Sequence, residues 1–170
     1  MNMEKKFELT DNFIINAFGV KLFQIKCTKS FKYAKEGDLG GYVEKDENLD
    51  QESDAWVYGN AEVSGNAWVY GDARVYGNAW VYGDARVYGN AEIDNNNKHC
   101  GFDCFGSANR HTHAYLTKEN KVEITCGCFR GSIEEFEKRV EETHSGTIYE
   151  KQYKAIIDVI KIKFGLTDLI

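Results

Sequence analysis

Apolar residues recur at every sixth position through the middle of the chain. In the same segment, a glycine followed by Asn or Asp also returns every six residues, from Gly59 to Gly89. The aliphatic positions are Val57, Val63, Val69, Val75, Val81, Val87 and Ile93, and the alanines are Ala55, Ala61, Ala67, Ala73, Ala79, Ala85 and Ala91. A fixed internal period of this kind indicates a stacked repeat architecture.

Each six-residue unit predicts one short strand followed by one corner. The aliphatic residue points inward, and the alanine is small because the interior narrows near the corner. Glycine with Asn or Asp gives the backbone the freedom that a tight corner needs. Three units complete a triangular coil of 18 residues, and successive coils pair in parallel. We therefore expect a mainly β protein with an α+β flank, centred on a left-handed parallel β-helix of about three coils.

The outward residues repeat every 12 positions, whereas the coil repeats every 18. This mismatch predicts Trp56 over Arg74 and Arg74 over Glu92, which places indoles beside guanidinium groups on adjacent coils. Such stacking is worth about 0.5–1 kcal/mol at exposed sites. The same spacing predicts four further outward pairs, which are Trp68 with Arg86, Glu62 with Trp80, Tyr58 with Tyr76, and Tyr70 with Tyr88.

These outward ladders have two interpretations. They stabilise a short solenoid or are buried against the flanks or a second subunit, or else they bind a planar or phosphorylated ligand or a partner protein. Trp, Tyr and Arg are typical of binding hot spots. A homo-oligomer, either a trimer or a dimer, accounts for both interpretations. The candidate binding residues are Trp56, Trp68, Tyr70, Arg74, Trp80, Arg86 and Tyr88.

The segment before the repeats predicts a strand and an atypical first coil. Residues 20–27 alternate as a strand does. Val43 and Leu49 continue the six-residue spacing backwards, so residues 39–54 form a capping coil. Residues 44–54 hold six acids and one lysine, which favours a solvated, edge-protecting cap. The alternative is an acidic docking patch, with candidates Glu44, Asp46, Glu47 and Asp50.

A small α+β module follows the repeats. Residues 111–116 and 121–126 predict a hairpin, Ser132 and Glu135 form a capping box that opens a helix, and a second helix covers about 148–164. We expect three parts: residues 1–38 as an N-terminal β segment, 39–94 as the β-helix, and 95–170 as the C-terminal module.

The charge and composition limit the possible environments and partners. The chain has 27 acidic and 21 basic residues, a net charge of −6, and no strongly basic region, so direct binding to nucleic acid is not expected. Neither a signal peptide nor an apolar run long enough for a membrane span is present, which favours the cytoplasm. The five cysteines are expected to be reduced thiols.

The Cys and His residues give no recognisable catalytic or metal-binding pattern. The spacing of Cys100, Cys104, Cys126 and Cys128 does not fit the common zinc knuckles, so no metal or other cofactor is expected. His111 and His113 share a strand face without a carboxylate or nucleophile at a recognisable spacing, so we predict no catalytic residue. Acyl transfer is the main enzymatic alternative, but residues 55–93 contain no histidine base and no protruding loop.

Three segments resemble a group of phage and prophage accessory proteins with hexapeptide repeats and a small C-terminal module. They are residues 36–43 (EGDLGGYV), the AWVYGN repeats, and residues 125–136 (TCGCFRGSIEEF) followed by Glu142 to His144. The resemblance implies a polymer-forming-like accessory protein in the cytoplasm of a bacterial host cell. Small acidic phage accessory proteins are often inhibitors of host systems.

We therefore expect a non-enzymatic binding protein that inhibits a bacterial defence system, anti-CRISPR-like or otherwise. In one mechanism, the acidic cap and the helical module bind a host defence protein or ribonucleoprotein. In the other, the Trp and Arg faces sequester a nucleotide signal between subunits. An acyltransferase-like enzyme and a structural assembly protein are the alternatives.

Overall fold

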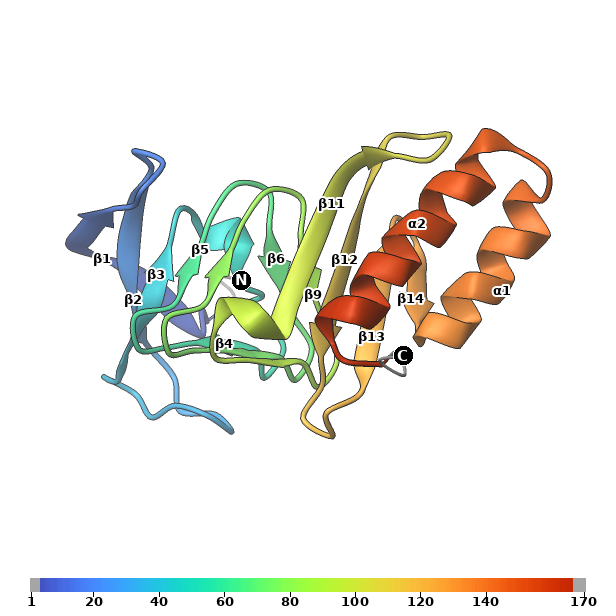
Figure 1. The fold of residues 1–170 in the computed structure, drawn as a ribbon. Coiled ribbons are helices and arrows are strands. Elements are labelled where there is room, and N and C mark those ends of the chain that lie inside the picture. Colours follow the sequence, from blue (N-terminus) through green and yellow to red (C-terminus); the bar gives the residue numbers. More distant parts are fainter. Residues whose placement is uncertain (1–3, 167–170) are drawn as a thin grey trace. The chain divides into compact units, whose positions relative to one another are not determined.

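The computed structural model describes residues 4–166. The chain divides into two compact units, residues 1–96 and residues 97–170, and each is considered by itself. Figure 1 shows strands throughout the first unit, and strands followed by two helices in the second. The protein is therefore mainly β with C-terminal helices. Within residues 4–166, no helix has the length and apolar character that crossing a membrane requires.

The first unit begins with an antiparallel hairpin. Strand β1 (Phe7–Ile15) pairs with β2 (Lys21–Cys27), which pairs in turn with β3 (Leu39–Val43). The turn between β1 and β2 is held by the Asn16 side chain, whose Oδ1 accepts hydrogen bonds from the amides of Phe18 and Val20. The sequence predicted β2, whereas β1 was not singled out.

Seven two-residue strands follow, one for each hexad. They are β4 (Trp56–Val57), β5 (Glu62–Val63), β6 (Trp68–Val69), β7 (Arg74–Val75), β8 (Trp80–Val81), β9 (Arg86–Val87) and β10 (Glu92–Ile93). Parallel pairing places β7 between β4 and β10, β5 between β3 and β8, and β6 beside β9. Each strand therefore pairs with the strand three hexads away.

The outward pairs predicted from the coil period are confirmed. Trp56 pairs with Arg74 and Arg74 with Glu92, 18 positions apart in each case. Glu62 pairs with Trp80, and Trp68 with Arg86. The Tyr58 and Tyr76 rings stack at 4.9 Å, and the Tyr70 and Tyr88 rings lie 4.3 Å apart at a tilt of 47°.

The first coil is irregular in a specific way. Val43 pairs with Val63 and Leu49 forms a bridge with Val69, so these partners are 20 positions apart instead of 18. Two extra residues are thus accommodated between Leu49 and β4. A 3₁₀ helix, η1 (Asp46–Asn48), forms the preceding corner, where the buried Asn48 side chain donates to the carbonyls of Gly65 and Ala67.

The interior of the repeats is uniform from coil to coil. All seven aliphatic positions from Val57 to Ile93 are fully buried, and the seven alanines are at most 3% exposed. Burying each aliphatic side chain contributes roughly 1.5–3 kcal/mol. The corners need glycine, as at Gly71, where φ is +75° and an added Cβ would lie 3.0 Å from the Gly89 amide nitrogen.

The second unit contains a four-stranded antiparallel sheet and two helices. After η2 (Asn96–Lys98), the strands are β11 (His99–Phe105), β12 (Arg110–Leu116), β13 (Val122–Cys126) and β14 (Phe129–Gly131). The predicted hairpin is confirmed as β12 and β13, whereas β11 and β14 were not anticipated. Figure 1 shows the helices α1 and α2 beside this sheet.

Both helices begin at the expected residues. Helix α1 (Ile133–His144) has the predicted capping box between Ser132 and Glu135, and Thr147 caps α2 (Ile148–Lys163). Their apolar faces form one core with the sheet. The central buried side chains of that core are Ile124, Phe136, Val140, Tyr153, Ile156, Ile157 and Ile160.

Candidate functional site

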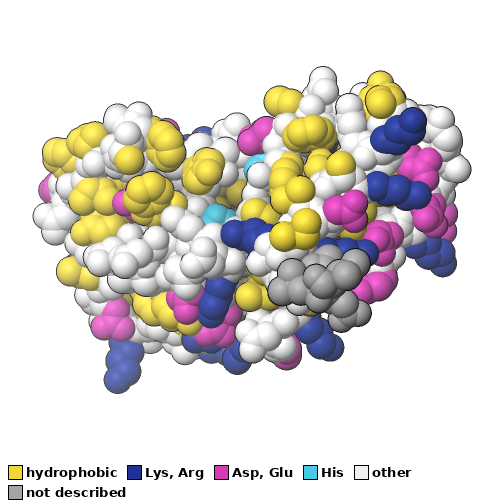
Figure 2. Space-filling model, viewed as in Figure 1, with side chains coloured by type: hydrophobic (Ala, Val, Ile, Leu, Met, Phe, Trp, Pro, Cys, Tyr) yellow, Lys and Arg dark blue, Asp and Glu magenta, His cyan; other side chains and the backbone are white. Residues whose placement is uncertain are grey.

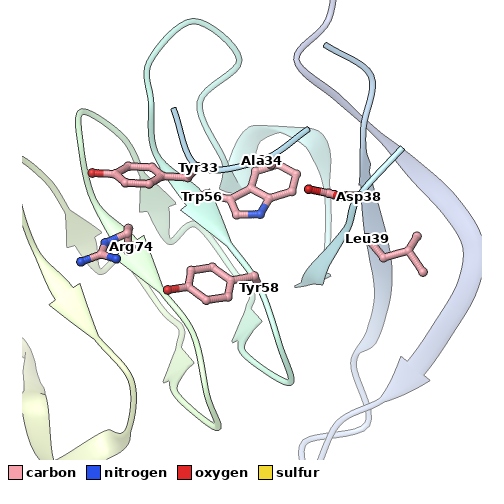
Figure 3. A pocket seen from close by; sticks show the side chains of 7 residues that line it. All are labelled: Tyr33, Ala34, Asp38, Leu39, Trp56, Tyr58 and Arg74. Carbon is pink, nitrogen blue, oxygen red and sulfur yellow. The ribbon is translucent and has the colours of Figure 1, made fainter. Parts of the chain in front are cut away.

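The first unit contains a pocket of about 380 Å³ on the face formed by β4 and β7. Figure 3 shows Arg74 and Leu39 toward opposite ends of it, with the rings of Tyr33, Trp56 and Tyr58 between them. The complete lining is Tyr33, Ala34, Asp38, Leu39, Trp56, Tyr58 and Arg74. Aromatic rings, one guanidinium and one carboxylate therefore meet in one cavity.

The repeat register explains one wall of this pocket. Trp56 and Arg74 are paired neighbours on β4 and β7, so their side chains leave the same face of the sheet. Tyr58 lies two residues after Trp56, at the corner of the same coil. Because these positions are fixed by main-chain pairing at 18-residue intervals, the wall is rigid.

The other wall comes from the segment between β2 and β3. The Tyr33 hydroxyl donates to Asp72 Oδ1 at 2.7 Å, and Lys32 forms an ion pair with the same carboxylate at 2.6 Å. The Asp38 carboxylate accepts from the Lys35 amide at 2.8 Å. This segment is thus anchored to the solenoid corner at Asp72, which holds the Tyr33 ring at the pocket.

Arg74 is fixed by charge and by aromatic rings. It forms an ion pair with Glu92 at 2.8 Å, and Glu92 also accepts a hydrogen bond from the Tyr76 hydroxyl at 2.7 Å. The guanidinium carbon lies 5.2 Å from the centre of the Tyr33 ring and 6.0 Å from that of Tyr76. Burial, reinforced by Glu92, raises the pKa of Tyr76, and burial also raises the pKa of Tyr58. Both phenols are therefore neutral hydrogen-bonding groups at pH 7.

Trp56 does not stack on Arg74 as expected. The indole is only 2% exposed and makes edge-to-face contacts with Phe7 at 6.4 Å and Phe31 at 5.3 Å. The strand pairing of Trp56 with Arg74 is confirmed, but the expected stacking of the indole on the guanidinium is not observed, because the segments before the repeats cover the indole and supply Tyr33 to the guanidinium. Trp56 is therefore mainly a core residue, and only the edge of its indole lines the pocket.

The remaining aromatic and arginine candidates lie on other faces of the solenoid. Trp80 is on β8, next to Glu62. Trp68 and Arg86 pair on β6 and β9, where Trp68 is 38% exposed and stacks on Tyr70 at 4.0 Å. Tyr88 contacts Tyr70 on that same side. The candidates Trp56, Arg74, Trp80, Trp68, Arg86, Tyr70 and Tyr88 are thus spread over three faces and do not form one site.

Three of the four acidic cap candidates have structural partners. The Glu44 carboxylate accepts from the Gly65 amide at 2.6 Å. Asp46 forms an ion pair with Lys5 at 2.7 Å, and Asp50 accepts from the Ser53 amide at 2.9 Å. Glu47 is exposed at the corner helix η1. These bonds favour the interpretation of the acids as residues that shape the first coil.

The second unit brings together histidines that the sequence left separate. His99 Nδ1 and His113 Nε2 lie 3.0 Å apart, and both residues are buried. His111 Nδ1 lies 2.5 Å from Asp103 Oδ1, so His111 does have a carboxylate partner, contrary to the sequence prediction. The missed element was β11, whose pairing with β12 has an irregularity between Phe102 and Phe105, the stretch that contains Asp103.

The five cysteines are free thiols, and burial raises the pKa of Cys100 to about 11. Cys126 instead faces the helices, where its sulfur accepts from Thr112 at 3.3 Å. In the part of the chain that the structure describes, no group of three His, Cys, Asp or Glu side chains is arranged to hold a metal ion.

Five lining residues of the pocket were not candidates in the sequence, and one of them is Tyr58 of the repeats. The other four are Tyr33, Ala34, Asp38 and Leu39. They carry no period and lie in an irregular segment before the repeats. Asp38 and Leu39 belong to the EGDLGGYV segment, whose composition was the sequence feature that could have indicated them. The pocket offers ring faces for stacking and a guanidinium for an anion, and the lining residues named above include no Ser, Thr, Cys, Lys or His.

Comparison with protein-family models finds one similarity. The model described as the YdcK β-solenoid repeat matches residues 55–71 and again residues 67–83. These two matches cover the first five strands of the hexad series, and they support a β-solenoid repeat there. Comparison of the chain with curated proteins gives no match.

Proposed function

We propose that this protein is a non-enzymatic binding protein that captures a planar, phosphorylated small molecule in the Tyr33–Arg74 pocket. The observation that carries the proposal is the meeting of Tyr33, Trp56, Tyr58 and Arg74 around a cavity of about 380 Å³. Ligand pockets typically have volumes of about 300–1,000 Å³ and combine apolar walls with a few polar groups. A nucleotide signal fits this chemistry.

The two parts of a nucleotide would have different partners in this pocket. A base stacks on an aromatic ring with roughly 1–3 kcal/mol, whatever its sequence identity. A phosphate is recognised by guanidinium donors, of which Arg has five. Glu92 binds Arg74 through Nη2, and Arg74 also forms a hydrogen bond with Tyr58, so we assign the remaining N–H donors of the guanidinium to the ligand. The pair with Glu92 also holds the guanidinium in place before binding.

We further propose that the biological role is that of a phage accessory protein that inhibits a bacterial defence system by removing its nucleotide signal. The sequence resemblance to phage and prophage proteins motivates this setting. Direct blocking of a defence protein by the acidic cap has less support, because Glu44, Asp46 and Asp50 are engaged in bonds within the chain.

The proposal includes the form of the solenoid and its assembly. The uninterrupted hexapeptide period supports a closed, left-handed winding. Trp68, exposed and stacked on Tyr70, supports homo-oligomerisation through the β6–β9 face. Analytical sedimentation of the wild type and of Trp68→Ser tests the assembly. The wild type should sediment as an oligomer, and Trp68→Ser should sediment as a monomer.

Calorimetric titration with a panel of linear and cyclic nucleotides tests the binding function. Saturable binding of at least one nucleotide is expected, with a loss of tenfold or more in Arg74→Met. Arg86→Met is the matched control, because Arg86 lies on a different face and its replacement should leave the affinity unchanged. Binding to no nucleotide, or equal loss in both variants, would contradict the proposal.

Phage plaque counts on bacteria that carry a nucleotide-signalling defence system test the biological role. The wild-type protein should restore plaques and Arg74→Met should not. Reversing the charges of Glu44, Asp46, Glu47 and Asp50 together should leave inhibition intact if the variant folds. Inhibition that survives Arg74→Met but is lost in the charge-reversal variant would instead support protein blocking by the cap.

A further inference from the structure

A second face of the solenoid carries a carboxylate among aromatic rings. Glu62 on β5 pairs with Trp80 on β8, and the tip of the β1–β2 hairpin lies over them. The Phe18 ring at this tip is 6.4 Å from Trp80 and 5.7 Å from Tyr82. Glu62 therefore lies beside three aromatic side chains from two different segments.

This carboxylate has no cationic partner within residues 4–166. It is half-buried, and it takes part in no hydrogen bond or ion pair there. Burial alone raises its pKa, with no nearby charge contributing. Glu92 differs in this respect, because its carboxylate forms an ion pair with Arg74 and accepts a hydrogen bond from the Tyr76 hydroxyl. A half-buried carboxylate without such partners carries an uncompensated desolvation cost.

The aromatic rings around Glu62 are open to solvent on their outer sides. Phe18 is 65% exposed and Tyr82 is 53% exposed. The space enclosed between them, Trp80 and Glu62 is only about 10 Å³, which corresponds to one water-sized sphere. A ligand must therefore enter by moving the Phe18 ring outward. The hairpin tip allows this, because the only ring contacts of Phe18 in the described chain are those with Trp80 and Tyr82.

Hydrophobic side chains are gathered on the surface around this place. Figure 2 shows them over the N-terminal strands, with few charged groups between them. At the site itself, the exposed rings are those of Phe18 and Tyr82. An apolar rim around a single acid favours a ligand that combines positive charge with hydrocarbon surface.

We propose that Glu62, Phe18, Trp80 and Tyr82 form a binding site for an organic cation, an alkylammonium or guanidinium group. The positive group lies at the Glu62 carboxylate, and its methyl or methylene groups pack on the rings. Aromatic faces attract such cations by about 0.5–2 kcal/mol each, and quaternary ammonium groups are recognised in this way. The cation supplies the charge partner that Glu62 lacks. Its methyl or methylene groups also make an apolar contact with the rings that a hydrated metal ion cannot make.

The test is titration of the full-length protein with choline and, separately, with N-acetylarginine amide, followed by the indole N–H signals in NMR spectra. The Trp80 signal is identified by its loss in Trp80→Phe. We expect a saturable shift of this signal with at least one probe, while the Trp56 and Trp68 signals stay in place. If choline binds more tightly, the ligand is a free ammonium compound. If the arginine derivative binds more tightly, the ligand is an arginine side chain of a protein.

Two variants and one control make the test decisive. Glu62→Gln should weaken binding tenfold or more, and Tyr82→Leu, which changes an exposed ring, should weaken it several-fold. Glu52→Gln removes an exposed carboxylate elsewhere and should bind as the wild type does. If neither probe shifts the Trp80 signal at 100-fold the protein concentration, with the salt concentration matched in the control, the proposal is overturned. Undiminished binding by Glu62→Gln that gives a native spectrum would overturn it as well.

Discussion

Two faces of the same solenoid differ in how their charges are compensated. The β4–β7–β10 face carries Trp56, Arg74 and Glu92 in successive coils, and the acid and base form an ion pair at 2.8 Å. The β5–β8 face carries Glu62 and Trp80, and its acid has no basic partner among residues 4–166. The inward residues beneath both faces are valines, except Ile93 of β10, and all are fully buried.

The difference arises from two departures from the outward repeat. A strict 12-residue repeat on an 18-residue coil would place Trp beside Arg on every face, but Glu62 stands where that repeat has Arg, and Glu92 stands where it has Trp. The flanking segments increase this difference. The segment around Tyr33 adds an aromatic wall and a pocket to the first face, whereas the hairpin tip adds Phe18 to the second. The hexads therefore fix the scaffold, and the chemistry depends on which outward residues meet.

The largest expected effect concerns the two tryptophans. Trp56→Ala should lower the free energy of unfolding by about 3–5 kcal/mol, because the indole is nearly fully buried against Phe7 and Phe31. Trp80→Ala, on the partly exposed face, should lower it by only about 1–2 kcal/mol. Urea unfolding followed by circular dichroism measures both. Equal losses would remove the structural distinction between the faces.

A second prediction concerns Lys6, which lies beneath the first face. Its ammonium group donates to the carbonyls of Ser53 and Ala55 and lies 5.1 Å from the Phe31 ring. Burial lowers its pKa to about 8, opposed by Asp50 and Asp54. Because the folded state loses this proton before the unfolded state does, Lys6 makes stability rise between about pH 8 and pH 10.5.

The rise attributable to Lys6 should be on the order of 3 kcal/mol. It is measured as the unfolding free energy of the wild type against that of Lys6→Met across this pH range. The variant should lack this component of the pH dependence. Parallel curves for the two proteins would show that Lys6 has an ordinary pKa in the folded state.

A third prediction compares the two outward acids directly. Glu92→Gln should destabilise the protein by about 1 kcal/mol, because it leaves the partly buried Arg74 without its ion pair. Glu62→Gln should be neutral or stabilising by a few tenths of a kcal/mol, because it removes a half-buried charge that has no partner. Thermal unfolding at pH 7 gives both values. Destabilisation by both changes would mean that Glu62 has a partner in solution.

The smallest effect is the pH dependence of Glu62. Its pKa is raised in the folded state, so the folded protein holds this proton more tightly than the unfolded chain. The associated stability is present at low pH and is lost as pH rises from 4.5 through the folded-state pKa. The wild type should therefore lose stability relative to Glu62→Gln over this range. An opposite slope would indicate a cation beside the carboxylate.

The sequence was sufficient for the repeats because their pattern is enforced at every coil. The inward position accepts only an aliphatic residue, the corner needs glycine, and main-chain pairing at 18 residues then determines the outward pairs. The helices were also predictable, since Ser132 with Glu135 and Gly165 mark their ends. Local rules decide all of these features.

The sites were not predictable in the same way. The pocket depends on Tyr33, whose position is set by a bond to Asp72, 39 residues away. The hairpin tip depends on Asn16, and Phe18 meets Trp80 across 62 positions of sequence. The His111–Asp103 pair required β11, which has no clear alternation of burial. Contacts between aperiodic segments and the solenoid carry no repeating signal that a single sequence reveals.

The most direct test of the central claim is an NMR titration of the wild type and Arg74→Met with nucleotides, followed at the Trp56 indole N–H. The Trp56 edge reaches the pocket, whereas Trp68 and Trp80 lie on other faces. If the pocket binds a planar phosphorylated ligand, the Trp56 signal alone should shift to saturation in the wild type and remain in place in Arg74→Met. A Trp56 signal that no nucleotide shifts, or that shifts equally in both proteins, would contradict the proposal that the pocket binds such a ligand.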